Sequence, residues 1–260
     1  MPEFIRVDVD ADSAVATLRL DRPKLNALNR QMQDEIRDAA GELEGRDDVR
    51  AVVIYGGERA FAAGADIKEM ADVDAVTMLQ RDSIARWDRL KRLRKPVIAA
   101  VSGYALGGGC ELAMACDLII ASEQAAFALP EPKVGLAALA GGLNRLPRQI
   151  GAKRALGMIL TGRHVPAREG YELGFVNEVV PHDQLMSAAR RWAEQICECA
   201  PLSIRASKDV VYRGLDIASL ADAMAQSPET FPRVYTAMVQ AGETGGFLDL
   251  VLAQIADFQA

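Results

Sequence analysis

The chain has 260 residues and a mass of 28.0 kDa, with 50% hydrophobic, 25% charged and 5% aromatic residues. This balance is typical of a globular protein and excludes a disordered or collagen-like chain. The net charge of −6 and the pI near 5.1 leave no broad basic surface for nucleic acid or an anionic membrane. We therefore expect neither as a partner.

The N-terminal residues and the cysteines indicate the cellular compartment in which we expect the protein. The N-terminal segment turns acidic at once and lacks the apolar core of a signal peptide, and no run of roughly eighteen apolar residues follows. The four cysteines show no CxxC spacing, which favours buried free thiols over a zinc or redox site. They are Cys110, Cys116, Cys197 and Cys199. We expect a cytoplasmic protein without a metal.

In chain order, the apolar pattern predicts an α/β fold. Residues 15–20 suit a strand, Asn29 is a good helix N-cap, and Gly45 suits the end of that helix. Apolar residues recur between them at spacings of three and four, namely Met32, Ile36, Ala39, Ala40 and Leu43. Buried strands are predicted at 51–55, 97–101 and 117–121, and a weaker one at 176–180. The remainder from Asp183 is mostly helical, so we expect a core of residues 1–195 and a helical C-terminal region of residues 196–260.

Residues 86–95 are basic and contain a tryptophan, so they could contact phosphates. However, Trp87, Leu90 and Leu93 recur at helical spacing, and cations favour the last turn of a helix. This pattern favours a solvated helix end that stops before Pro96.

Two loops of small residues follow predicted strands. Residues 59–68 follow the strand at 51–55, and residues 103–111 follow the strand at 97–101 and lead into a helix predicted from Glu111 to Cys116. The glycines of the second loop would present free N–H groups at a helix N-terminus, which can bind a phosphate or a transient oxyanion.

The pattern argues against two familiar phosphate loops. A dinucleotide-binding GxGxxG loop needs Gly or Ala where Leu112 stands, and Glu111 would repel a pyrophosphate. A Walker A loop is excluded because no GK[ST] follows the glycines. A purely structural role, tight packing of strand and helix, stays open for these glycines.

A second carboxylate favours catalysis. Glu131 lies between Pro130 and Pro132 in an apolar stretch, just after another predicted strand. With Glu111 it could form a proton-transfer pair beside backbone donors that hold negative charge on a carbonyl oxygen. The alternative is that Glu131 caps a helix or pairs with an arginine.

The motifs at these positions resemble the crotonase (enoyl-CoA hydratase/isomerase) superfamily, and most closely its short-chain enoyl-CoA hydratases. The resemblance runs from Ala14 to about Gly214 and includes the segments 21–29, 60–70, 95–101, 103–114 and 160–162. It implies a spiral of ββα units, a helical C-terminal trimerisation region, and a homotrimer or a hexamer made of two trimers. It also implies an acyl-CoA ligand, with coenzyme A part of the substrate and no separate cofactor.

The resemblance also assigns roles by position. The backbone amides of Ala65 and Gly108 would form the oxyanion hole, Glu111 would activate water for attack at C3, and Glu131 would deliver a proton to C2. The substrate-binding positions that it implies are Lys24, Ala27, Arg59, Ala63, Asp66, Ile67, Lys68 and Leu139. Arg145 matches an arginine with a structural role, and no role is expected for His164 or His182.

Two departures from the family pattern affect these expectations. Ala138-Leu139 stands where relatives have a Pro-Gly step whose glycine amide holds the catalytic water, and no Lys or Arg follows Arg233. An apolar stripe predicts a buried helix there instead, formed by Leu248, Val251, Leu252, Ile255 and Phe258. The expected activity is reversible hydration of a trans-2-enoyl-CoA to a 3-hydroxyacyl-CoA. The alternatives are an isomerase or dehydratase of a specialised acyl-CoA, and a catalytically silent acyl-CoA-binding or RNA-binding scaffold.

Overall fold

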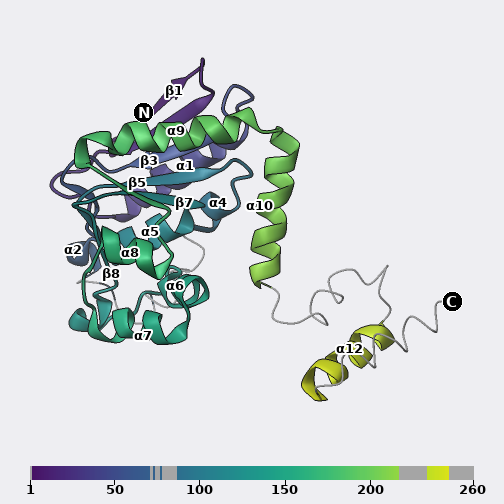
Figure 1. The fold of residues 1–260 in the computed structure, drawn as a ribbon. Coiled ribbons are helices and arrows are strands. Elements are labelled where there is room, and N and C mark those ends of the chain that lie inside the picture. The colour runs from purple at the N-terminus through teal and green to yellow at the C-terminus, as the bar shows by residue number, and fades with distance from the viewer. Residues whose placement is uncertain (1, 71–72, 74–76, 78–86, 217–232, 246–260) are drawn as a thin grey trace. The chain divides into compact units, whose positions relative to one another are not determined.

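Two sheets organise the fold in the computed structural model, which describes residues 2–70, 73, 77, 87–216 and 233–245 (Figure 1). The larger sheet has the strand order β1-β2-β3-β5-β7-β10, and the smaller has the order β4-β6-β8-β9. Only the pairs β1–β2 and β8–β9 are antiparallel among the described strands. The strands are β1 (Ile5–Asp10), β2 (Val15–Leu20), β3 (Ala51–Tyr55), β4 (Ala60–Ala62), β5 (Val97–Val101), β6 (Tyr104–Leu106), β7 (Leu118–Ser122), β8 (Ala126–Ala128), β9 (Val165–Pro166) and β10 (Glu178–Val180).

Helices connect and cover the strands (Figure 1). They are α1 (Arg30–Glu44), α2 (Ile67–Met70), α4 (Asp88–Lys91), α5 (Gly108–Ala115), α6 (Gly142–Ile150), α7 (Ala152–Thr161), α8 (Ala167–Leu173), α9 (Leu185–Glu198), α10 (Pro201–Asp216) and α12 (Arg233–Gly245), with short 3-10 turns η2 (Glu131–Val134) and η3 (His182–Gln184). No helix in these ranges is both long and apolar enough to cross a membrane.

Helix α1 follows the sequence prediction closely. The Asn29 side chain accepts a hydrogen bond from the Met32 amide at 3.0 Å and so caps the first turn, and the helix ends at Gly45. Its buried residues are the five that the spacing predicts. The period of the apolar residues therefore identifies both the helix and the face that it buries.

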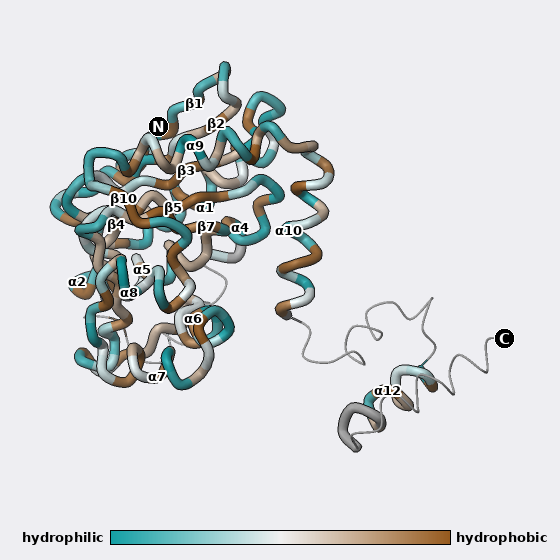
Figure 2. Tube along the Cα trace, viewed as in Figure 1, coloured by the Kyte–Doolittle hydropathy of each residue, from teal (hydrophilic) through white to brown (hydrophobic). Residues whose placement is uncertain are grey.

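The continuous apolar runs are strands buried on both faces. In β3, Ala51 and Val53 belong to the core that includes the buried face of α9, whereas Val52 and Ile54 belong to the core that includes α1. Because successive side chains of a strand point to opposite faces, a strand covered on both sides needs apolar residues at every position. Figure 2 shows the resulting hydrophobic colouring along β3, β5 and β7.

Three predicted boundaries differ from the structure. The strand predicted at 117–121 is β7 at Leu118–Ser122, and the one predicted at 176–180 is β10 at Glu178–Val180. The helix predicted from Glu111 to Cys116 is α5 at Gly108–Ala115, because Gly107 adopts a positive φ of 51° and already serves as its N-cap. The glycine loop therefore includes the first turn of the helix.

The prediction of a solvated helix end for residues 86–95 is wrong at Lys95. This side chain is 2% exposed, and its ammonium donates to the carbonyl oxygens of Leu43, at 2.5 Å, and of Arg46. Leu43 lies in the last turn of α1 and Arg46 just beyond its C-cap Gly45, where the helix dipole is negative and helix carbonyls lack an i+4 donor. Lys95 therefore caps α1 from a distant part of the sequence.

The chain divides into two compact units, Met1–Ala206 and Ser207–Ala260. The sequence places the change between 195 and 196, within α9, but α9 packs on β3, β5 and β7 of the first unit. The described part of the second unit consists of residues 207–216, which end α10, and of α12. The apolar stripe predicted from Leu248 to Phe258 lies outside the described residues.

We predict that Lys95→Met lowers the free energy of unfolding by about 2 to 4 kcal/mol. The carbonyls of Leu43 and Arg46 lose their charged donor, and the backbone hydrogen bonds that they keep from the Arg46 and Val49 amides are long, at 3.4 Å. Urea denaturation measures this loss. Lys153→Met, at an exposed position of α7, is the matched control and should change stability by less than about 0.5 kcal/mol. Equal effects of the two substitutions would contradict the capping role.

Candidate active site

The first of the two small-residue loops leads to Ala65. Leu28 and Ala65 form a parallel bridge in which the Leu28 amide donates to Gly64 O at 2.7 Å and the Asp66 amide donates to Leu28 O at 3.3 Å. This pattern uses the amides of Leu28 and Asp66 but leaves the amide of Ala65 without a partner in the bridge. The Ala65 N–H thus makes no backbone hydrogen bond in the described part of the chain.

The second loop places Gly108 beside Ala65. A Cβ on Gly108 would lie 3.6 Å from the Ala65 nitrogen, and Gly108 is the first residue of α5, where helix amides have no partner in the helix. The approach is close because a Cβ on Gly109 would lie only 2.1 Å from Ala62 O, so only glycine fits there. The structure therefore brings together the two amides that the sequence assigns to the oxyanion hole.

Glu111 lies in the first turn of α5, three residues after Gly108. Its side chain is 3% exposed, and its Oε1 accepts a hydrogen bond from the Gly142 amide at 2.9 Å. Gly142 begins α6, so the start of a second helix holds the carboxylate in place.

Glu131 approaches the same helix N-terminus from η2. A Cβ on Gly107 would lie 3.0 Å from Glu131 Oε1, which places this carboxylate next to the N-cap of α5. The other oxygen, Oε2, is buried and has no hydrogen-bond partner within the described ranges. The alternative that Glu131 pairs with an arginine finds no support there, since no ion pair of Glu131 occurs among these residues. A buried carboxylate oxygen without a donor favours the protonated acid.

Burial controls the protonation of both carboxyl groups. Loss of solvent is the main cause that raises the pKa of Glu111 to about 7; the Gly142 amide opposes this rise, and the charge of Glu131 adds to it. Burial also raises the pKa of Glu131. Near neutral pH the site can therefore hold one acid and one base, which is the arrangement that proton transfer requires.

Two residues that sequence reasoning missed hold the first loop in place. Asn26, which has a positive φ of 54°, donates from its amide to Gly56 O at 2.5 Å and to Phe61 O at 3.1 Å. Arg22 donates to Ala27 O at 2.6 Å and pairs with Asp66 at 2.7 Å. Their signal was present in the segment 21–29, but the spacing alone does not show which backbone they contact.

The predicted substrate-binding residues mostly lie at the surface of these loops. Lys24, Arg59, Ile67 and Lys68 are exposed, and Ala27 and Ala63 are half-buried. Asp66 is different, because its hydrogen bond with Arg22 lowers its pKa and holds the carboxylate in an ion pair. These side chains stay predictions as substrate contacts.

The segment that departs from the family pattern contacts the Glu111 site. Ala138 is buried, and its Cβ would lie 2.9 Å from a Cβ on Gly142. Leu139 is 49% exposed, and its amide donates to Ala137 O at 2.9 Å, so in this turn the amide is already engaged. Arg145 donates to Ala140 O at 3.0 Å and thereby supports the turn, as its expected structural role requires.

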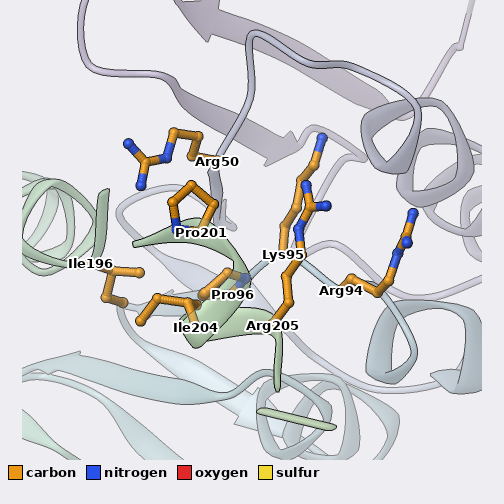
Figure 3. A pocket seen from close by; sticks show the side chains of 8 residues that line it. All are labelled: Arg50, Arg94, Lys95, Pro96, Ile196, Pro201, Ile204 and Arg205. Atoms are coloured by element: carbon orange, nitrogen blue, oxygen red, sulfur yellow. The ribbon is translucent and has the colours of Figure 1, made fainter. Parts of the chain in front are cut away.

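A basic pocket lies beside the N-terminal ends of β3 and β5, opposite the candidate active site (Figure 3). Arg50 precedes β3 and Lys95 precedes β5, whereas the candidate site lies beyond the other ends of these parallel strands. Three of its cations have partners within the protein: Arg50 donates to Cys199 O, Arg94 pairs with Glu44, and Lys95 caps α1. No acid lines the pocket, so it lacks the groups for proton transfer.

The described residues include possible metal ligands and four cysteine thiols. Within the described ranges, no group of three or more His, Cys, Asp or Glu side chains is placed to hold a metal ion. All four cysteines are free, but the prediction of buried thiols is right only for Cys110 and Cys116, because Cys197 is half-buried and Cys199 is exposed at the end of α9. Burial raises the pKa of the Cys110 thiol, which keeps it protonated.

We predict that the Glu111→Gln variant gains stability relative to the wild type as the pH rises. The folded pKa near 7 lies above the ordinary value of 4.5, so the wild type binds more protons when folded and loses stability as the pH rises from about 4.5 to 7. Glutamine removes this loss, which is of order 3 kcal/mol. Urea denaturation of both proteins at about pH 5 and pH 8 measures it; an equal stability difference at both pH values would contradict the raised pKa.

Known proteins resemble this chain over most of its length. The family model described as enoyl-CoA hydratase/isomerase matches residues 10–244. A probable enoyl-CoA hydratase of Mycobacterium bovis is 42% identical over 242 residues, which cover 93% of this chain and 94% of the relative. A short-chain-enoyl-CoA hydratase of Clostridium acetobutylicum is 37% identical over 251 residues, covering 95% and 96%.

The solved structures agree in fold as well as in sequence. An enoyl-CoA hydratase structure from Geobacillus kaustophilus superposes with a TM-score of 0.81 at 40% identity and covers 95% of each chain. The α/β fold with its parallel sheets matches the crotonase fold that the motifs predict. The chain belongs to the enoyl-CoA hydratase/isomerase family, the crotonase superfamily.

Proposed function

We propose that this protein is an enoyl-CoA hydratase that adds water reversibly across the trans-2 double bond of an enoyl-CoA. The observation that carries this proposal is the convergence of buried Glu111 and half-buried Glu131, whose Oε2 is buried, on the helix N-terminus. Beside them lie two backbone amides that make no backbone hydrogen bond within the described residues. A scaffold without catalysis would gain nothing from removing two carboxyl groups from water wholly or in part, because the raised pKa values oppose their ionisation.

The amides of Ala65 and Gly108 would bind the thioester oxygen. Attack of water at C3 shifts the double-bond electrons towards this oxygen and creates an enolate. Two N–H donors that are already in position stabilise that charge without reorganisation, and one such donor is typically worth about 3 to 4 kcal/mol. Because both are backbone groups, side-chain substitutions at these positions would act through geometry.

The two glutamates would move the protons. Ionised Glu111 takes one proton from water as the water oxygen bonds to C3, and protonated Glu131 donates its proton to C2 as the enolate collapses. Proton transfer from Glu111 back to Glu131 then restores the starting state. No electron leaves the substrate, so the reaction needs no redox cofactor, and coenzyme A is the carrier of the acyl group.

We predict rapid loss of the enoyl-thioester absorbance when the protein is added to crotonyl-CoA. Glu111→Gln and Glu131→Gln should each lower kcat by about 10² to 10⁴, since each removes one proton-transfer group. The matched control is Glu172→Gln, which changes an exposed glutamate of α8 paired with Arg168 and should leave kcat unchanged.

Other outcomes would redirect the assignment. Full activity in either active-site variant would exclude that residue as a proton donor or acceptor. Inactivity of the wild type on crotonyl-CoA, with conversion of a 3-enoyl-CoA or of a polar acyl-CoA, would favour the isomerase or dehydratase of a specialised acyl-CoA. The engaged Leu139 amide supports that alternative, because it removes one donor for the catalytic water.

Leu139 is the proposed determinant of acyl specificity. Its apolar side chain is exposed on the turn that adjoins the buried Ala138 and the Glu111 site. We predict that Leu139→Ala raises kcat/KM for a longer enoyl-CoA relative to crotonyl-CoA by about tenfold, as expected when a few methylene groups gain space. Leu160→Ala, at a position that is 71% exposed on α7, should leave the ratio unchanged. An unchanged ratio in Leu139→Ala would place Leu139 outside the acyl path.

We further propose a cytoplasmic homotrimer, or a hexamer of two trimers, with no nucleic-acid or membrane partner. Free cysteines suit a reducing compartment. Exposed apolar side chains on α10, including Leu202 at 78% and Val210 at 68%, support an interface between copies. Light scattering would test the assembly, and a monomer at micromolar concentration would contradict it.

A further inference from the structure

A buried cluster joins an imidazole to two serine hydroxyls. His182 Nδ1 lies 3.0 Å from Ser102 Oγ and 3.3 Å from Ser122 Oγ, and both serines are 0% exposed. Ser102 follows β5, Ser122 ends β7, and His182 lies shortly after β10, so the cluster spans the ends of three neighbouring parallel strands. His182 has no acid or nucleophile at motif spacing, which is why the sequence assigns it no role.

The hydrogen-bond directions determine which ring nitrogen carries a proton. The Ser102 hydroxyl donates its one hydrogen to Glu58 O at 2.8 Å, so it has none for His182. The contact at 3.0 Å then requires the Nδ1–H of His182 to donate to Ser102 Oγ. A directed chain runs from His182 through Ser102 to the Glu58 carbonyl.

This chain ends where the two site strands begin. Glu58 lies two residues before β4, which leads to Ala65, and Ser102 lies two residues before β6, which leads to Gly108. The strands pair in parallel with Ala60 opposite Tyr104, and an adjacent bridge joins Ala60 to Gly103. The offset between β4 and β6 therefore sets how the amides of Ala65 and Gly108 lie relative to each other.

We infer that His182 is a positioning residue of the active site: through Ser102 it fixes the Glu58 carbonyl, and with it the offset of β4 against β6 on which the two-amide oxyanion site depends. The inference rests on the proposed function and extends it to a residue that contacts no substrate. Its physical basis is that catalysis tolerates little displacement of its groups. Preorganised donors must stay within about 0.5 Å of their productive positions, and a misplacement of about 1 Å can lower the rate about a hundredfold.

The test compares His182→Leu with His182→Asn. Leucine removes the donor at similar size, whereas the asparagine amide can donate to Ser102 from a position close to that of Nδ1. We expect His182→Leu to lower kcat on crotonyl-CoA by about ten- to hundredfold, with KM changed less than about threefold, and His182→Asn to recover most of this loss. His164→Leu removes the other histidine, whose ring makes an edge contact with Tyr104 among the described residues, and should leave kcat unchanged.

A spectroscopic readout separates positioning from stability. A bound para-dimethylaminocinnamoyl-CoA absorbs at longer wavelength when amide donors polarise its thioester carbonyl. We expect the wild type, His182→Asn and His164→Leu to give the full red shift and His182→Leu to give a reduced one. If His182→Leu does not fold, Ser102→Ala, which breaks the same chain at its centre, should show the same losses.

Each other result overturns one proposal or both. A full red shift and an unchanged kcat in His182→Leu or Ser102→Ala would reduce the cluster to a stabilising contact and overturn the inference. A wild type that shifts the chromophore but does not hydrate crotonyl-CoA would overturn the proposed hydratase alone, since the variants can still be compared by the red shift. A wild type that does neither would overturn both.

Discussion

The candidate site depends on one close approach of backbone to backbone. The strand β4 and the first turn of α5 lie so near each other that a Cβ on Gly109 would overlap Ala62 O at 2.1 Å. This approach places the Gly108 and Ala65 amides side by side and sets the direction of α5, which carries Glu111 into the interior. Any side chain at position 109 would separate the strand from the helix, and the amides and the acid would move apart together.

Burial has opposite consequences for stability and for chemistry at this site. Removing Glu111 from water raises its pKa into the range where it can exchange protons near neutral pH, and the same desolvation destabilises the ionised folded state. Glu131, with one buried oxygen that lacks a donor, carries a similar cost. The large apolar core on both faces of the six-stranded sheet supplies the stability that offsets these costs.

The sequence predicts what local periodicity and residue type determine. The face of α1, the buried strands β3 and β5, and the glycine loop before α5 all follow from patterns within a few residues. What it misses are partners that meet only in the folded chain. Lys95 lies 52 residues from Leu43, whose carbonyl it binds, and His182 lies 80 residues from Ser102. A basic stretch and a lone histidine carry no local sign of such contacts.

In the proposed site the backbone stabilises negative charge and the side chains transfer protons. This separation explains how proteins of one fold can catalyse different reactions. The amides of Ala65 and Gly108 are present whatever side chains surround them, so the site can stabilise an enolate in any relative that keeps the close approach. In the proposed mechanism the fate of that enolate depends on the side chains, because Glu111 and Glu131 transfer the protons. We propose that the turn at Ala138 and Leu139 determines which acyl group and water fit beside them, because Ala138 packs against Gly142, the residue whose amide holds Glu111. We therefore expect differences in activity within the family to arise at these few side chains. In this chain, the proposed role of the His182–Ser102 contact is to maintain the strand offset that positions the amides.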